Sequence, residues 1–280
     1  MTGYQPGFRQ AFNPAIYLIS LLPGIGVWIL AGKSDSAGIH WLLPATLAVV
    51  ALQHAINLLN DVSDWKLGAD AEKFDSWVRF HRLDTGIASL HGWISFVLGG
   101  LLGLTVLVLA DRLWLLAIAS PMLALGYLYN SGPRPLSYTY LGEWVTGLCY
   151  GPGVFGCLWL LGNRSAGPTA VLGMIAFAAL AMSLLLSHQP PQIETDRLSG
   201  KLSFAVRYGT ARTRQASRLL FTVFLLGFGM ALWLAGSDSA TSLIYSALSL
   251  LAWLWVALLP PKPATILIPS ALVLTATLAT

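Results

Sequence analysis

Charged side chains are scarce in this sequence. Lysine, arginine, aspartate and glutamate make up only 10% of its 280 residues, whereas an ordinary soluble domain has roughly 25%. Hydrophobic residues account for 56%. This composition excludes an ordinary soluble domain and predicts a polytopic membrane protein. The formal net charge of +4 is too small to indicate a nucleic-acid partner.

Cysteine is also rare. The two cysteines, Cys149 and Cys157, lie in one apolar run, which predicts buried free thiols and no disulfide framework. No removable signal peptide is evident, because the first apolar segment is long enough to be a span and carries Pro14, Pro23 and Gly24. Because the cysteines are expected to be free thiols, they do not identify a compartment.

Long apolar runs, in contrast, are abundant. Nine segments have the roughly 17 to 25 residues that a spanning helix requires. They cover about 12–32, 41–60, 86–110, 113–130, 141–161, 168–188, 215–236, 240–259 and 264–280. We therefore expect one transmembrane domain over residues 1–280.

The basic residues are distributed unequally between the two sides of these segments. Lys33, Arg112 and Arg164 lie on one side, and the other thirteen of the sixteen lie on the opposite side. The positive-inside rule makes the richer side cytoplasmic. We therefore expect a protein of the inner (cytoplasmic) membrane with a cytoplasmic N-terminus and two long polar cytoplasmic loops, 61–85 and 189–214.

The first of these loops opens with an unusual cluster of oxygen ligands. Residues 57–70 read NLLNDVSDWKLGAD. If the preceding apolar helix continues, Asn57, Asn60, Asp61 and Asp64 share one of its faces. Such carboxylate and amide oxygens suit Mg²⁺ that also binds substrate phosphates. The alternative is a solvated helix end, since Asn and Asp are common caps and turn formers.

The second loop combines acids with bases. Residues 188–209 read HQPPQIETDRLSGKLSFAVRYG, in which Glu194 and Asp196 precede Arg197, Lys201 and Arg207. Metal ligands beside cations are what a diphosphate site needs, because both neutralise a leaving group that gains charge. The alternative is a basic loop that contacts anionic lipid headgroups, which we favour for Arg212, Arg214 and Arg218 further along.

These two loops resemble the aspartate-rich motifs of the UbiA-type intramembrane prenyltransferases. The spacing from Asn60 to Asp64 and Asp70 is similar to the branch that prenylates 1,4-dihydroxy-2-naphthoate in menaquinone biosynthesis. So is the turn YNSGPRPLSYTYLGE at 129–143. The resemblance implies an all-α fold of nine transmembrane helices around a central cavity, capped by the two Asp-rich loops on the cytoplasmic side.

The resemblance also implies a reaction and roles for individual residues. The reaction would be Mg²⁺-dependent transfer of a prenyl group from a prenyl diphosphate to an aromatic, quinone-precursor acceptor within the lipid membrane, with Asp64 and Asp196 as the central catalytic residues. Asn60, Asp64 and Asp70 would hold one Mg²⁺, and Asp196 and Gln192 are the candidates for a second. The candidates for binding the diphosphate are Asn57, Asp61, Arg82, Arg134 and Lys201.

The chain departs from the family pattern at Gln192. The family usually has Asp four residues before the position of Asp196, and the amide at Gln192 offers an oxygen without a charge. This departure keeps a terpene cyclase of the same superfamily, or an unusual acceptor, open as alternatives. An ion-coupled transporter is a weaker alternative, because the acids lie in loops and no pair of matching broken helices is apparent.

Two further groups near the motifs have candidate roles. Tyr127, Tyr129, Tyr138, Tyr140 and Tyr150 cluster around the fourth and fifth segments, where they would line the site of an allylic cation or serve as ordinary interfacial anchors. His54 lies one turn before the first motif. It is a candidate proton acceptor, although a packed histidine with a satisfied hydrogen bond is the commoner case.

Overall fold

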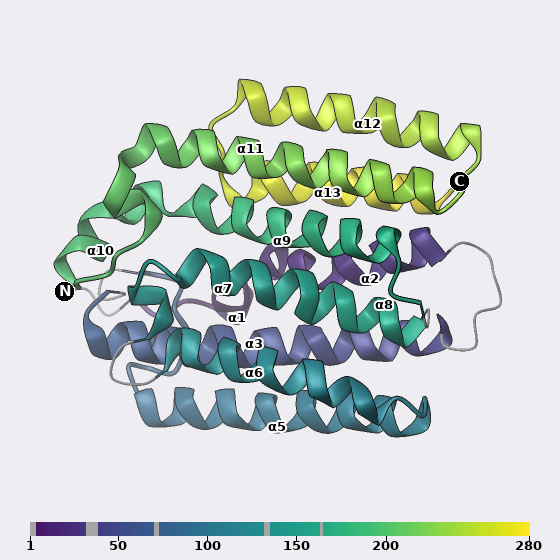
Figure 1. The fold of residues 1–280 in the computed structure, drawn as a ribbon. Coiled ribbons are helices and arrows are strands. Elements are labelled where there is room, and N and C mark those ends of the chain that lie inside the picture. The colour runs from purple at the N-terminus through teal and green to yellow at the C-terminus, as the bar shows by residue number, and fades with distance from the viewer. Residues whose placement is uncertain (1–3, 32–38, 70–72, 132–134, 163–164) are drawn as a thin grey trace.

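The structure is a computed structural model of the 280-residue chain, and it describes all residues except 1–3, 32–38, 70–72, 132–134 and 163–164. The described residues form helices and connecting loops without any strand. The long helices lie side by side along one direction (Figure 1). The expected all-α fold is therefore confirmed for the described part of the chain.

Eight helical segments are long and apolar enough to cross a membrane. Their helices, in order, are α1 (Phe8–Phe12) with α2 (Leu18–Ala31), α3 (Leu42–Leu67), α5 (Thr85–Leu109), α6 (Leu116–Asn130), α7 (Gly142–Leu148) with α8 (Cys157–Gly162), α9 (Pro168–His188), α11 (Phe204–Leu234) and α12 (Ser239–Leu258). The ninth expected segment forms α13 (Pro263–Leu278). At ~1.5 Å per residue this helix is short for a bilayer core of about 30 Å, so its spanning role remains a prediction.

Short helices fill the connections. They are α4 (Trp77–Phe80), α10 (Ile193–Leu198) and the one-turn helices Pro14–Tyr17, Ile39–Trp41, Leu113–Leu115, Leu136–Tyr138 and Pro190–Gln192. A π-helix at Cys149–Gly156 joins α7 to α8 and contains Pro152. Proline lacks the N–H that a regular helical bond needs, and the wider turn accommodates it.

Two boundaries differ from those expected from hydropathy. α3 continues past residue 60 to Leu67 and ends where Gly68 adopts a φ of 85°, a conformation that glycine adopts without strain. α11 begins at Phe204 instead of about 215, and Gly209 kinks it. Hydropathy finds only the apolar part of a helix, so the basic first turns of α11 are assigned to a loop.

The core lies where α2, α9, α11 and the α8 end of the π-helix meet. Phe155, Phe177 and Phe228 are fully buried there, with the rings of Phe155 and Phe177 stacked at 5.0 Å. Gly173 faces Phe155 so closely that a Cβ would collide with its ring. Small residues of this kind allow helices in a membrane to pack closely.

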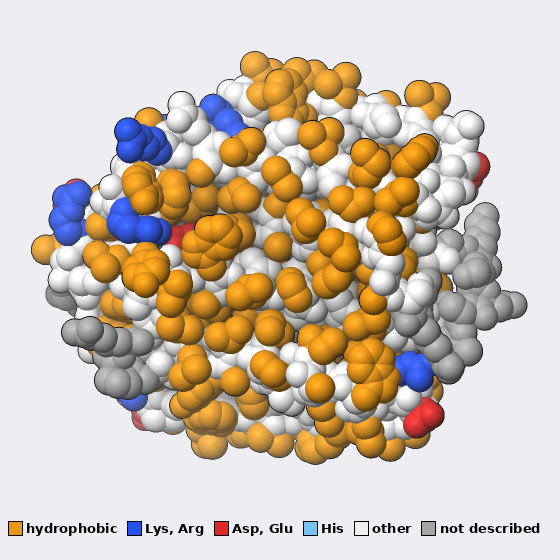
Figure 2. All heavy atoms as spheres, in the orientation of Figure 1, with side chains coloured by type: hydrophobic (Ala, Val, Ile, Leu, Met, Phe, Trp, Pro, Cys, Tyr) orange, Lys and Arg blue, Asp and Glu red, His pale blue; other side chains and the backbone are white. Residues whose placement is uncertain are grey.

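The outer surface is apolar over most of the helix length. Figure 2 shows hydrophobic side chains covering the middle of the molecule, with Lys and Arg gathered mainly toward the α10 end. Large apolar side chains of α5 and α12 such as Leu98, Leu109 and Leu243 are exposed. This surface suits lipid, and it leaves the polar chemistry to the α10 end and the interior.

Candidate active site

One large cavity runs through the interior and joins the two predicted motifs. Its volume is about 510 Å³, within the range of roughly 300 to 1,000 Å³ for small-molecule sites. Its polar walls come mainly from the two motif regions and from the start of α7, and include Asn57, Asn60, Asp61, Asp64, Lys73, Glu143, Gln189, Gln192, Asp196 and Lys201. Its apolar walls come mainly from residues nearer the other end of the helices, including Ala48, Leu104, Leu107, Leu116 and Leu123.

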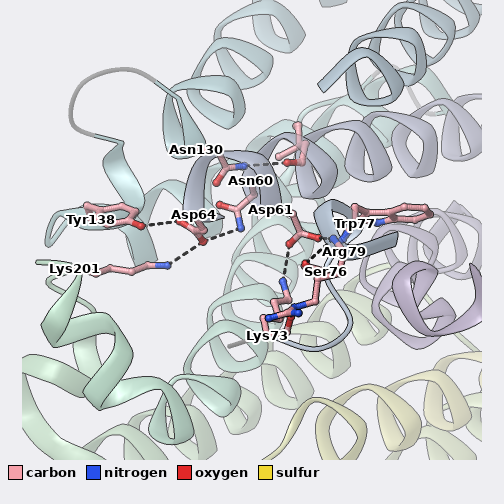
Figure 3. A network of polar contacts seen from close by, with 11 residues as sticks. Asn60, Asp61, Asp64, Lys73, Ser76, Trp77, Arg79, Asn130, Tyr138 and Lys201 are labelled. Carbon is pink, nitrogen blue, oxygen red and sulfur yellow. Dashed lines mark hydrogen bonds and ion pairs between the residues drawn. The ribbon is translucent and has the colours of Figure 1, made fainter. Parts of the chain in front are cut away.

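Asp64 is the point where the motifs meet. Its carboxylate is buried and accepts hydrogen bonds from the Tyr138 hydroxyl at 2.9 Å and from the Asn60 amide at 3.2 Å. The Lys201 ammonium lies 3.5 Å from the same carboxylate. Figure 3 shows Tyr138 and Lys201 directed toward Asp64 from separate parts of the chain, and Asn60 from the preceding turn of α3. The continuous helix and the converging motifs are therefore both present.

Asp61, one turn earlier, has different partners. It accepts a hydrogen bond of 2.6 Å from the Lys73 ammonium and one of 2.7 Å from the backbone N–H of Trp77. Arg79 donates from Nε to the carbonyl of Lys73 at 2.8 Å and lies over the Trp65 ring. Asp61 therefore holds the segment that follows the first motif against α3.

Asp196 contributes a buried carboxylate from the second motif. It accepts a 2.7 Å hydrogen bond from the Ser203 hydroxyl. Burial raises the pKa of Asp196, and the negative charges of Asp64 and Glu143 add to that rise, while the Lys201 charge opposes it. Because burial and like charges disfavour its ionised form, this carboxylate suits a bound cation.

Lys201 connects the second motif to the rest of the site. Its backbone N–H donates to the carbonyl of Asp196 at 2.8 Å, which closes the turn after α10. Its ammonium also lies over the Tyr138 ring at 5.2 Å. The single lysine thus touches the first motif through Asp64, the second through its own backbone, and the turn between α6 and α7.

The other predicted site residues are distributed unevenly. Asn57 and Gln192 line the cavity. Arg82 is exposed and is not among the described cavity-lining residues. Asp70 and Arg134 lie outside the described residues. Glu194, which a helical projection separates from Gln192, is exposed and pairs with Arg197 at 3.2 Å.

Of the five tyrosines predicted near the site, some lie at the cavity and others are exposed. Tyr129 and Tyr150 line the cavity, and Tyr138 contacts Asp64. Tyr127 and Tyr140 are exposed. Tyr129 and Tyr150 are therefore available to a bound molecule, Tyr138 is placed to orient Asp64, and the exposed pair suits the interfacial alternative.

Glu143 was missing from the predicted site, although it is buried and lines the cavity. It accepts hydrogen bonds from the Gln189 amide at 3.1 Å, the Phe204 backbone N–H at 2.7 Å and Arg207 at 3.1 Å. It thereby fixes the start of α11 to α7. Its signal in the sequence was an acid inside the apolar segment 141–161, near its start, a position that favours a functional or structural partner.

The donor set fits magnesium held jointly with a substrate. Among the described residues, no three His, Cys, Asp or Glu side chains converge as a ready cation site. Mg²⁺ does not require such a cage, because it is usually bound through one or two carboxylates plus substrate phosphates. Buried Asp64 and Asp196, with the oxygens of Asn60 and Gln192 in the same cavity, meet this description.

Comparison with known proteins decides the family. The sequence pattern of the UbiA prenyltransferase family matches residues 18–264, which is most of the chain. The protein belongs to the UbiA prenyltransferase family. It is accordingly a membrane prenyltransferase, an enzyme that transfers an alkyl group other than methyl, and the resemblance inferred from the motifs is confirmed.

Relatives of this UbiA member are named as octaprenyltransferases and phytyltransferases. A 1,4-dihydroxy-2-naphthoate octaprenyltransferase of Mycobacterium tuberculosis is 33% identical over 72% of this chain and 71% of its own. The Bacillus subtilis enzyme of the same name is 30% identical over 91% and 78%. A 2-carboxy-1,4-naphthoquinone phytyltransferase of Synechocystis is 30% identical over 71% and 65%.

Solved structures share the fold of this UbiA member. A UbiA homologue from Aeropyrum pernix has a TM-score of 0.70 at 15% identity, with 95% of this chain and 97% of that chain covered. A UbiA homologue from Archaeoglobus fulgidus, bound to GPP and Mg²⁺, has a TM-score of 0.66 at 16% identity, with 99% and 97% covered. At these identities the likeness establishes the fold alone.

Proposed function

We propose that this UbiA member transfers a prenyl group from a prenyl diphosphate to 1,4-dihydroxy-2-naphthoate, in a Mg²⁺-dependent step of menaquinone biosynthesis. The observation that carries the proposal is the 3.5 Å ion pair between Lys201 and Asp64, because it puts a cation for phosphate beside carboxylates for a metal. The names of the relatives from Mycobacterium tuberculosis and Bacillus subtilis support the choice of acceptor.

The cavity has the polarity that a prenyl diphosphate requires. The diphosphate would lie at its polar end, where Lys201 and Lys73 are, with Asn57, Arg82 and Arg134 as further candidate ligands. Asp61 would support this end of the cavity by holding Lys73. The prenyl chain would lie along the apolar walls made by residues such as Leu104, Leu107 and Leu116. Because lipid tails are as apolar as these walls, the walls would place the chain beside the polar end without a large gain in affinity over the bilayer.

Different site residues would contribute to different parts of the ionisation of the prenyl diphosphate. Asn60, Asp64 and Asp70 would hold one Mg²⁺, and Asp196 and Gln192 a second. Bound Mg²⁺ would supply neutralisation of the charge that the diphosphate gains as it leaves. The π faces of Tyr129 and Tyr150, which line the cavity, would stabilise the allylic cation.

We also propose a membrane orientation. The chain would cross the membrane nine times, with α13 as the last span, and both motif loops would lie in the cytoplasm. The thirteen basic residues on the side of the motif loops support this orientation. A cysteine in place of Arg214 should resist a membrane-impermeant thiol reagent in intact cells, whereas one in place of Asp238 should react. The unsubstituted protein is the control for Cys149 and Cys157, and labelling at 214 alone would contradict this orientation.

Product analysis tests the reaction. Purified protein in lipid vesicles would be incubated with octaprenyl diphosphate, Mg²⁺ and 1,4-dihydroxy-2-naphthoate, and the extracted lipids analysed by mass spectrometry. The proposal expects a prenylated naphthalene that requires both the acceptor and Mg²⁺. A cyclic hydrocarbon formed equally well without the acceptor would instead identify a cyclase, the alternative that Gln192 keeps open.

A further inference from the structure

Three of the five histidines form a hydrogen-bonded chain that leads away from the cavity. Tyr17 lines the cavity, and its hydroxyl lies 2.7 Å from His54 Nδ1. His54 Nε2 lies 3.4 Å from His91 Nε2, and His91 Nδ1 lies 3.1 Å from His81 Nε2. The four residues come from four parts of the fold: the turn before α2, α3, α5 and the end of α4.

The chain connects a buried end to an exposed one. Tyr17 is only 4% exposed. His81 is partly exposed, and the three residues after it are exposed. Asp84, among those residues, is the charged group whose field acts on His81. The order of contacts therefore runs from the cavity wall to the surface near the first motif loop.

The contacts permit a proton to move along the chain in either direction. If the Tyr17 hydroxyl donates to His54, each neutral imidazole can donate from its other nitrogen to the next ring. If every proton shifts to the opposite nitrogen, all three contacts are retained with reversed donors. Two equivalent arrangements of one hydrogen-bonded chain are what a proton relay requires.

The same geometry argues against a metal site. His91 contacts His54 through Nε2 and His81 through Nδ1, so its two nitrogens point to different neighbours. The three rings therefore cannot converge on one ion through these contacts. This agrees with the lack of a ready metal cluster among the described residues.

Aromatic side chains surround the relay. The Trp77 ring packs against all three histidines. Its ring centroid lies 5.1 Å from that of His54, 5.2 Å from that of His91 and 6.3 Å from that of His81. Phe12 stacks on Tyr17 at 4.5 Å. Such packing limits the access of water along the sides of the chain and leaves its ends as the points of proton exchange.

A neighbouring amide marks where a hydroxyl would bind. Gln53 precedes His54 in α3, lines the cavity and donates from its amide nitrogen to the carbonyl of Ile16, the residue before Tyr17. Its amide oxygen is buried and has no hydrogen-bond partner among the described residues. A buried acceptor without a partner is costly, and a hydroxyl donor on a bound acceptor would satisfy it.

We propose that Tyr17, His54, His91 and His81 form a proton relay that ionises the hydroxyl of the aromatic acceptor, a role that rests on the prenyl transfer proposed above. Tyr17 is the catalytic residue at the substrate, and the histidines act through it. The acceptor hydroxyl gives its proton to the Tyr17 oxygen as the Tyr17 proton passes to His54. Each histidine hands a proton to the next, and His81 releases one to water.

The remaining steps balance. The ionised ring attacks prenyl C1 through carbon, the new C–C bond forms, and the C1–O bond breaks with its electron pair leaving on the diphosphate. If the ring carbon carries hydrogen, that proton moves to the ring oxygen and one proton per turnover stays in water. If it carries a carboxylate, CO₂ leaves and the relay returns a proton to the ring oxygen.

Replacing the middle residue tests the relay. His91→Gln keeps groups that can hydrogen-bond on both sides, but an amide does not pass protons readily. With 1,4-dihydroxy-2-naphthoate and octaprenyl diphosphate, kcat should fall about tenfold, which is less than the roughly 10²- to 10⁴-fold that direct acid–base catalysis contributes. The ratio of kcat in H₂O to that in D₂O should change, while KM for the prenyl diphosphate stays constant. His40→Gln, at an exposed histidine outside the relay, should behave as wild type.

Other outcomes would overturn the relay. Unchanged kcat and isotope ratio in His91→Gln would do so, as would a loss of kcat with an unaltered isotope ratio, which indicates packing only. If His91→Gln does not fold, His81→Gln at the surface end is used with the same criteria. Nitrogen-15 spectra of the histidine rings test the chain without turnover, since hydrogen-bond coupling must link His91 to both neighbours. A wild type that makes no prenylated product would overturn the proposed function separately.

Discussion

Asp61 and Asp64 are one helical turn apart on α3 and equally buried, at 5% and 4% exposure, yet they serve different regions. The Asp61 region consists of backbone and side-chain groups from the next loop, Lys73 and the Trp77 N–H. The Asp64 region consists of side chains from distant segments, Tyr138 and Lys201. Burial and residue type alone therefore do not separate a structural carboxylate from a catalytic one.

The difference lies in what the partners are attached to. The Trp77 N–H is a backbone group, so Asp61 is needed to hold the fold of its own loop. The partners of Asp64 are side chains that a ligand can rearrange, and one of them carries a positive charge suited to phosphate. We infer that the Asp61 region supports the site and the Asp64 region performs the reaction.

The largest expected effect comes from neutralising Asp64. Asp64→Asn keeps the shape and removes the charge, so turnover should fall by at least about a hundredfold, as when a group that stabilises transition-state charge is lost. Prenyl-transfer rates at saturating Mg²⁺ measure this. Asp238→Asn is the matched control, because Asp238 caps α12 through Thr241 and Asn is an equally good cap. Full activity of Asp64→Asn would remove the metal-site assignment.

A smaller and different effect is expected for Asp61→Asn. The amide oxygen can still accept from Trp77 N–H, but the ion pair with Lys73 is lost. Because Lys73 is 35% exposed, solvent screening limits the loss to about 1 kcal/mol. Thermal unfolding in detergent should shift down by a few degrees, about 2 to 4 °C, and turnover should fall less than about tenfold. A loss of turnover as large as that of Asp64→Asn, with unchanged unfolding, would erase the distinction between the two regions.

Gln192 lines the same cavity as Asp64, and the next largest effect is expected there. An added carboxylate near a divalent ion gains roughly 1 to 4 kcal/mol per unit charge at effective dielectrics of about 80 to 20, and desolvation cancels part of this gain. Gln192→Asp should therefore lower the half-saturating Mg²⁺ concentration several-fold in an activity titration. Identical Mg²⁺ curves with a changed product would instead mean that Gln192 faces the acceptor.

The contrast also explains what the sequence could and could not predict. The i, i+3, i+4 spacing predicted that Asn57, Asn60, Asp61 and Asp64 share a face, and all four line the cavity. The spacing cannot predict Lys73 as the partner of Asp61, because that contact depends on the path of a loop. Likewise, Glu143 is visible in the sequence as an acid near the start of an apolar segment, and only tertiary packing brings Gln189 and Arg207 to it.

The histidine chain was still harder to anticipate. His54 was recognisable as a candidate because it precedes the first motif by one turn. His81 and His91 lie in different elements, and their ring contacts arise from the packing of α3 against α5 and α4. Local patterns therefore predicted the helices and the acidic motifs, whereas pairings between elements required the structure.

The smallest expected effect concerns Asp196, which faces the Asp64 region across the cavity. Burial raises its pKa above the ordinary value of 3.8, so the folded state favours the protonated form. Its contribution to stability is therefore fully present below the ordinary pKa and is lost as the pH rises through the raised value. In EDTA, raising the pH from acidic to neutral should lower the unfolding temperature of wild type more than that of Asp196→Asn. Mg²⁺ with a prenyl diphosphate should reverse this difference at neutral pH, because a bound cation favours the charged carboxylate. Parallel unfolding profiles in EDTA would show that Asp196, like Asp61, has its charge satisfied by the fold alone.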